Sequence, residues 1–170
     1  MTSMHSVSSA ADAIRPTISV KPGPYDHPDA RHLVRALRQE QIDLYGFADE
    51  PDTTPADDFA APGRFLIARL GREPVGCAGV RFLDARTAEI KKMYVALRVR
   101  RFRLGHTLLE LLETHAARHG ATRILLETGH RNTAALALYE SAGYVPRESY
   151  IPGRDRNVNR AMTKTLGAPS

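Results

Sequence analysis

A basic turn between a strand pattern and a helix pattern constrains the fold of this chain more than any other feature. The strand pattern covers Ala88–Val95, and it leads through Arg98-Val-Arg-Arg-Phe-Arg-Leu-Gly105 into the leucine-rich run 106–113. A helix N-terminus presents unpaired backbone N–H groups and the positive end of the helix dipole. Arginines and a glycine at that place therefore predict an anion site, and we expect a phosphate-bearing cofactor as its ligand.

A second segment restricts the shape of the ligand. Residues 125–129 predict the end of a strand, and 132–142 predict a short alanine-rich helix that Gly143 stops. Asn132 and Tyr139 then lie two helical turns apart on one face, about 10 Å along the axis. Two polar groups at this spacing can hold the ends of an extended arm. A purely structural interpretation also stays open, with Asn132 as a helix cap and Tyr139 as a core aromatic.

Apolar alternation, capping residues and Pro/Gly punctuation predict the remaining elements. The predicted strands cover residues 17–20, 65–70, 75–82, 88–95, 123–128, 144–150 and 158–165, and the predicted helices cover 26–45, 103–119 and 132–142. Asp26 is the expected cap of the first helix. Successive β–α–β units predict an α/β fold with a mixed sheet, in one domain over residues 17–166. Residues 1–16 are expected to form a mobile leader and 167–170 a tail.

Charge and composition narrow the classes of partner. The net charge is +5, but the basic residues concentrate at positions 91–103, beside the predicted helix start. A phosphate-bearing small ligand explains that concentration, so no nucleic-acid partner is expected. No apolar run reaches the length of a membrane span and no signal peptide is recognisable, which predicts no membrane association and a cytoplasmic location. The sequence leaves monomer and homodimer open.

The two segments, in this order, resemble the GCN5-related N-acetyltransferase (GNAT) family. That family follows a Met-Tyr-Val-like strand with Arg/Gln-x-x-Gly-x-Gly/Ala, and places Leu-Glu-Thr-Gly…Asn…Ala…Leu-Tyr-Glu…Gly-Tyr/Phe downstream. The second pattern is nearly complete between Leu126 and Tyr144. The resemblance implies a GNAT-like acyl-CoA N-acyltransferase fold, with acetyl-CoA as the cosubstrate and no metal.

The resemblance also implies which residues hold the cofactor. They are Met93, Tyr94, Val95, Arg100, Arg101, Arg103, Leu104, Gly105, His106 and Asn132. One position departs from the family, because Arg103 stands where the family has a glycine that lets the backbone approach the pyrophosphate. If its backbone is right-handed, the side chain can swing outward and add a cation to the site. If the side chain intrudes, cofactor binding suffers.

The catalytic assignments come from the same resemblance. In the family the asparagine contacts the pantetheine arm, and the tyrosine, here Tyr139, can protonate the leaving thiolate as a general acid. Glu89 is the expected base, with a water chain or a solvated carboxylate paired with Lys91 as alternatives. The apolar alternation slips at Lys91-Lys92, which predicts a β-bulge that frees backbone groups for the pantetheine amides.

Three further features have structural alternatives. Cys77 lies in an apolar strand and is expected to be buried rather than acylated. His115 and His119 have metal-ligand spacing, but they fit an apolar stripe and a helix end, so no metal is expected. Six acidic residues without a basic one can form a rim that attracts cationic amines, or a solvated loop: Asp43, Asp49, Glu50, Asp52, Asp57 and Asp58.

These observations favour an acetyl-CoA-dependent N-acetyltransferase that moves an acetyl group to a primary amine of a small molecule by direct transfer in a ternary complex. A protein N-terminal or lysine acetyltransferase is the alternative within the enzyme class. A catalytically silent acyl-CoA-binding module is the alternative of another class, because of Arg103. Fold and cofactor site do not identify the acceptor.

Overall fold

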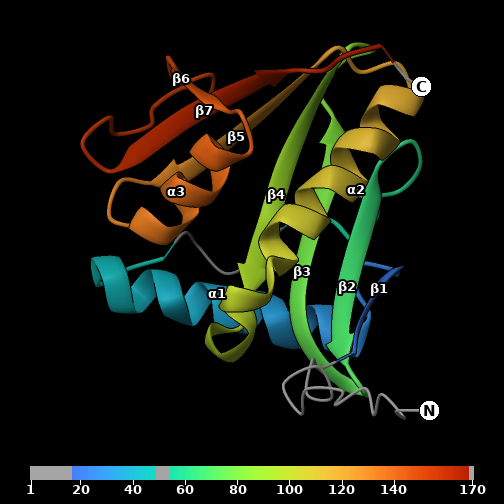
Figure 1. Ribbon diagram of the computed structural model, residues 1–170. Helices are drawn as coiled ribbons and strands as arrows, with labels where there is room; N and C mark the ends of the chain where they lie inside the picture. Colours follow the sequence, from blue (N-terminus) through green and yellow to red (C-terminus); the bar gives the residue numbers. More distant parts are fainter. Residues whose placement is uncertain (1–16, 49–53, 169–170) are drawn as a thin grey trace, which may run out of the picture.

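A mixed seven-stranded sheet in the order β1-β2-β3-β4-β5-β7-β6 forms the centre of the protein (Figure 1). The computed structural model describes residues 17–48 and 54–168. The strands are β1 (Ile18–Pro22), β2 (Arg64–Leu70), β3 (Glu73–Phe82), β4 (Thr87–Val95), β5 (Arg123–Gly129), β6 (Val145–Arg147) and β7 (Asn159–Thr165). Neighbouring strands are antiparallel except β4 and β5, which are parallel. The predicted α/β class is confirmed.

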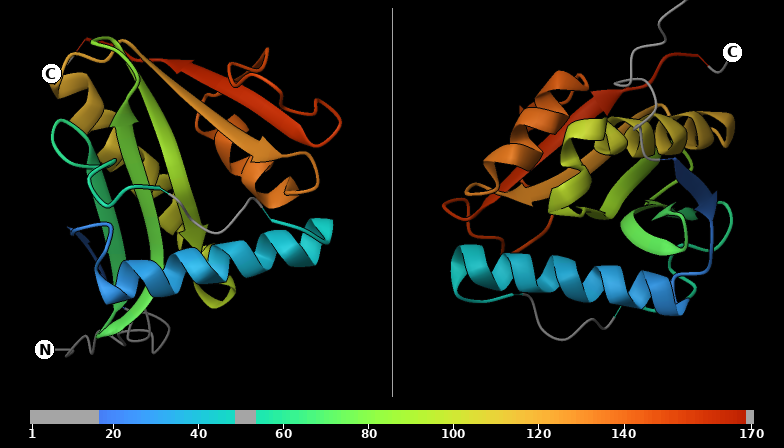
Figure 2. Two further views of the ribbon diagram at one scale, coloured as in Figure 1. Left: turned by 180° about the vertical axis from the view of Figure 1, so that it is seen from behind. Right: turned by 60° about the horizontal axis from the view of Figure 1, so that its bottom comes forward.

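Helices cover both faces of this sheet. They are α1 (Pro28–Tyr45), α2 (Leu104–Arg118) and α3 (Thr133–Ser141), and a short 3₁₀ helix, η2 (Leu97–Phe102), precedes α2. Figure 2 shows α1 lying across the sheet on the face opposite α2. On the α1 face Leu33 packs in one apolar cluster with Ile67, whereas Leu108 and Leu112 pack in another on the α2 face. Burial of these two faces holds the strands in place.

The parallel strands β4 and β5 diverge, and this opening positions the candidate site. They pair only over residues 87–89 and 123–125, and Figure 1 shows them spreading apart beyond that point. The predicted bulge in β4 is confirmed, because the pairing with β3 shifts between Cys77 and Gly79. Lys92 adopts φ 58° there, and its carbonyl accepts a 3.2 Å hydrogen bond from the Cys77 thiol. The β4 edge beyond Glu89 therefore faces the opening instead of β5.

Several predicted boundaries need correction. The cap of α1 is His27 rather than Asp26, since the His27 Nδ1 accepts a 3.0 Å hydrogen bond from the Asp29 N–H. The predicted strand 144–150 is reduced to the short β6, because Pro146 donates no hydrogen bond and the chain then leaves the sheet. The predicted leader, 1–16, and the last two tail residues lie outside the described residues. In the described ranges no helix is long and apolar enough to cross a membrane.

Candidate active site

A cavity of about 380 Å³ lies where β4, the start of α2 and α3 meet. Residues from the predicted cofactor set that line it are Met93, Tyr94, Val95, Arg100, Arg103, Gly105, His106 and Asn132. We call this space the cofactor cavity. The side chains of the two other predicted residues lie elsewhere. Arg101 is exposed, with its guanidinium 5.9 Å from the Phe102 ring centroid. Leu104 is buried in the core, so only its backbone can reach a ligand.

The start of α2 is a candidate anion cradle. Its N-cap is Arg103, and no side chain caps the helix. The first N–H groups of a helix have no partner within it, so those of Leu104, Gly105 and His106 can donate to an anion such as a pyrophosphate. Arg103 has φ 58° and ψ 23°, which is left-handed. The right-handed backbone on which the outward swing depended is therefore not present, and Arg103 occupies a region that glycine adopts without strain.

Gly105 lies at the contact between α2 and α3. A Cβ atom on Gly105 would lie 2.8 Å from Cδ2 of Leu138, so its absence lets α3 approach α2 closely. The sequence pattern assigned this glycine to the cofactor and did not indicate the contact. His106 joins the same two helices, because its Nε2 lies 2.7 Å from the Ser141 hydroxyl. That hydroxyl donates to the Leu138 carbonyl, so it accepts from His106.

Arg100 lines the cofactor cavity, but its charge is already paired. Its Nε donates a 2.9 Å hydrogen bond to the Val95 carbonyl, and its terminal nitrogen forms an ion pair with Glu40 of α1. This pair connects α1 to the turn that follows β4. Glu40 was not predicted, because a contact across 60 positions leaves no local pattern.

Asn132 and Tyr139 occupy the same helix as predicted. Asn132 caps α3, with its Oδ1 accepting a 3.1 Å hydrogen bond from the Ala135 N–H, and it also lines the cofactor cavity. The capping interpretation is therefore confirmed, and Asn132 also remains a candidate site residue. Tyr139 is 5% exposed, and its ring packs 5.8 Å from that of Tyr144. Burial raises the pKa of Tyr139 well above its usual value, so its hydroxyl keeps a proton to donate.

A second space, the acceptor cleft, lies between α1 and the diverging strands. Two adjoining hollows form it, with Leu37, Gln41, Lys91 and Lys92 among their shared walls. The outer hollow reaches Tyr139, and it shares Glu40, Met93 and Asn132 with the cofactor cavity. The inner hollow reaches Glu89.

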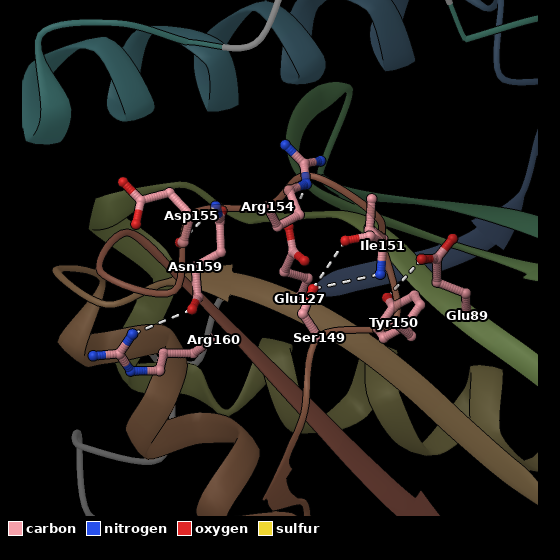
Figure 3. Close-up of polar contacts among 9 residues, drawn as sticks. All are labelled: Glu89, Glu127, Ser149, Tyr150, Ile151, Arg154, Asp155, Asn159 and Arg160. Carbon is pink, nitrogen blue, oxygen red and sulfur yellow. Dashed lines mark hydrogen bonds and ion pairs between the residues drawn. The ribbon is translucent and has the colours of Figure 1, made fainter.

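Glu89 is 3% exposed and is held by two donors. Its Oε1 accepts a 2.8 Å hydrogen bond from Arg81 Nε. Its Oε2 accepts one of 2.6 Å from the Tyr150 hydroxyl, which Figure 3 shows. The alternative of a solvated carboxylate paired with Lys91 is therefore wrong. Tyr150 was missed, because it belongs to the irregular loop after β6, where the sequence predicted the end of a strand.

Cys77, His115 and His119 have structural contacts. Burial raises the pKa of the Cys77 thiol to about 12, which keeps it an unreactive thiol. The His115 Nε2 donates to the Pro62 carbonyl and the His119 Nδ1 to the His115 carbonyl, both at 2.8 Å. Of the predicted acidic rim, Asp58 pairs with Arg81 and Asp43 accepts from Gln39. Asp49, Glu50 and Asp52 lie outside the described residues.

Comparisons with known proteins agree with this geometry. The family model "Acetyltransferase (GNAT) family" matches residues 31–144. An "IAA acetyltransferase" from Azospirillum brasilense is 34% identical over 136 residues, which is 79% of this chain and 88% of that protein. An acetyltransferase structure from Streptococcus agalactiae has a TM-score of 0.72 at 22% identity, over 88% of this chain and 98% of the other.

A GNAT family acetyltransferase from Elizabethkingia anophelis, solved with acetyl-CoA bound, shares the fold. Its TM-score is 0.63 at 20% identity, over 89% of this chain and all of the other. The family match spans most of the sheet, the anion cradle and α3. The chain belongs to the GNAT acetyltransferase family.

Proposed function

We propose that the protein is an acetyl-CoA-dependent N-acetyltransferase that acetylates the primary amine of a small molecule by direct transfer in a ternary complex. The observation that carries the proposal is the junction between the two spaces. Met93 and Asn132 line both the cofactor cavity and the acceptor cleft. Both substrates can therefore occupy the protein together, with their reactive ends meeting at this junction.

The chain's own groups fit the cofactor. Uncapped N–H groups at the start of α2 suit the pyrophosphate. The β4 edge at Met93, Tyr94 and Val95 faces the opening and offers backbone groups to the pantetheine amides. Bound acetyl-CoA supplies a thioester carbonyl that an amine can attack.

Two residues move the protons. The Glu89 carboxylate accepts a proton from the acceptor ammonium, directly or through a water chain, and leaves a neutral amine. The amine nitrogen bonds to the acetyl carbon as the carbon–sulfur bond breaks. Tyr139 donates its hydroxyl proton to the leaving sulfur, which departs as a thiol. The amine nitrogen loses a second proton as the amide forms, and this proton returns Tyr139 to its phenol form through water. Glu89 then releases its own proton to solvent. The Cys77 thiol is fully buried, which supports direct transfer rather than an acyl-cysteine route.

The walls of the acceptor cleft support a small acceptor over a protein. Helix α1 contributes Leu37 and Gln41 to one side, and the loop after β6 contributes Tyr150, Ile151 and Arg154 to the other. Figure 3 shows Tyr150 and Arg154 between α1 and the sheet. We expect this loop to obstruct an extended peptide more than a small amine.

Thiol release from acetyl-CoA with a panel of small amines and matched peptides tests the proposal. We expect release with small amines and intersecting double-reciprocal plots, as a ternary complex requires. Parallel plots would indicate a covalent acyl-enzyme instead. Release with peptides alone would favour a protein acetyltransferase. Acetyl-CoA binding by calorimetry without any release would favour the silent module.

A further inference from the structure

We propose that the acceptor is an amine that also carries a carboxylate, as an amino acid does, and that Arg38 and Lys91 bind this carboxylate. The inference rests on the proposed acetyltransferase function and names the class of its acceptor.

The charges on the inner hollow of the acceptor cleft are unbalanced. Its wall contains four cationic side chains against two carboxylates: Arg38, Lys91, Lys92, Arg154, Glu89 and Glu127. Each carboxylate already has an arginine, since Glu89 pairs with Arg81 at 2.8 Å and Glu127 with Arg154 at 3.0 Å. Within residues 17–48 and 54–168, Arg38 and Lys91 form no ion pair of their own. The wall therefore presents positive charge to whatever enters.

Lys91 is placed to receive an anion in the cleft. It is half-buried, and burial together with the nearby Arg81 lowers its pKa. An ammonium group in this situation gains from an anionic ligand that replaces lost hydration. Lys91 lies two positions after Glu89 in β4, so both side chains leave the same face about 6.6 Å apart. When the amine of an acceptor lies at Glu89, a second group a few bonds away on the same molecule therefore lies near Lys91.

Arg38 completes the pair from the opposite wall. It lies on the stretch of α1 that lines the cleft together with Val34, Leu37 and Gln41. Its guanidinium is exposed, so it can bind an incoming carboxylate through two parallel hydrogen bonds without first losing another partner. A carboxylate between Lys91 and Arg38 would fix the orientation of the acceptor, with its amine toward Glu89.

Matched acceptors test the inference. The wild-type protein is assayed with a panel of L-amino acids and with their primary amides, which keep the amine and side chain but lose the carboxylate. We expect kcat/KM about tenfold higher for the acids, the size of one charge-assisted hydrogen bond. Lys91→Gln and Arg38→Gln should each raise KM for the acids about tenfold, with a clearly smaller effect on the amides.

Arg35→Gln is the matched control. Arg35 is an exposed arginine of α1 that does not line the acceptor cleft. This change should therefore leave kcat/KM unchanged for both the acids and the amides. Arg38→Glu changes an exposed position, so it keeps the inference testable if Lys91→Gln does not fold. It should make kcat/KM higher for the amides than for the acids. Equal turnover of acids and amides in the wild type, or equal losses for both in the variants, would overturn the inference alone. Absence of thiol release with every acceptor would overturn the proposed function, and the inference with it.

Discussion

The hydroxyl of Tyr150 donates a 2.6 Å hydrogen bond to Oε2 of Glu89, across 61 positions of the chain. With Arg81 on Oε1 at 2.8 Å, both oxygens of the proposed base are held. Burial and the Glu89 carboxylate raise the pKa of Tyr150, so the phenol stays protonated and remains a donor. We therefore expect Tyr150 to act as a positioning residue for Glu89.

Tyr150→Phe should lower kcat about tenfold, because the released carboxylate samples orientations in which it does not face the amine. Its effect should depend on Glu89. In a Glu89→Gln background, which itself should cost a factor of about 10² to 10⁴, the second change should add little. Rates measured on the four proteins of this cycle check the prediction. Additive losses would show that Tyr150 acts independently of Glu89.

Tyr139 and Tyr144, whose rings meet edge to face, should differ in their effects on catalysis and on stability. Tyr139→Phe should lower kcat about a hundredfold with little change in acetyl-CoA affinity, because it removes the proposed proton donor. The Tyr144 hydroxyl instead donates to Glu113 at 3.2 Å. Tyr144→Phe should therefore lower the unfolding free energy by about 1 kcal/mol and leave kcat close to wild type. An unchanged kcat in Tyr139→Phe, with chemistry rate-limiting, would remove it from the mechanism.

What the sequence predicted well depends on neighbours along the chain. The bulge at Lys91-Lys92 followed from a local slip in apolar alternation, and the Asn132 cap followed from its place before an alanine-rich run. The α/β class followed from the order of strands and helices. Each of these reflects a backbone state that a few adjacent residues determine.

What the sequence did not predict depends on contacts between distant segments. Neither the Arg81 and Tyr150 partners of Glu89 nor the Glu40 partner of Arg100 leaves a local pattern. The sequence of a strand does not show whether a distant loop covers one of its carboxylates, as the loop after β6 covers Glu89. Gly105 matched a phosphate-binding motif, and the sequence did not indicate that it also lies against Leu138 of α3.

The ion pair between Arg100 and Glu40 should limit the positive potential of the cofactor cavity. Glu40→Gln keeps a side chain of the same size and removes the negative charge. It should tighten acetyl-CoA binding several-fold, because Arg100 then faces the cofactor unopposed. Calorimetry at two ionic strengths checks this, with a larger effect expected at low salt. Weaker binding would mean that the pair is needed to hold the cavity open.

His115 should make stability fall in mild acid. Burial lowers its pKa in the folded protein, so the unfolded chain binds its proton more readily than the folded one. Stability rises with pH wherever the unfolded state holds more protons. The contribution of His115 to the unfolding free energy is therefore complete at pH 8. It declines as the pH falls below about 6.5, the pKa of the histidine in the unfolded chain.

His115→Gln checks this prediction, because glutamine does not titrate and can still donate to the Pro62 carbonyl. The difference in unfolding free energy between wild type and variant, from denaturant titrations at pH 8 and pH 5, should shrink in acid. A difference that stays constant would assign the acid sensitivity to another group.

Replacing Arg103 with glycine should stabilise the fold but weaken acetyl-CoA binding. Its left-handed backbone, with φ 58°, costs an ordinary residue roughly 1–2 kcal/mol, and glycine avoids this cost. Glycine gains about 0.4–1 kcal/mol of freedom in the unfolded chain, which offsets part of the benefit. Arg103→Gly should therefore raise the unfolding free energy by up to about 1 kcal/mol. The same change removes a cation from the cofactor cavity, so the Kd of acetyl-CoA should rise several-fold.

Arg103→Asn separates the two effects, because asparagine tolerates the left-handed region but carries no charge. It should weaken acetyl-CoA binding as the glycine does, with a smaller gain in stability. Arg101→Gln removes a neighbouring charge outside the cofactor cavity and should leave the Kd nearly unchanged. If Arg103→Gly instead tightens binding strongly, the arginine side chain intrudes where the family has glycine. That outcome would favour the catalytically silent acyl-CoA-binding module over the proposed enzyme.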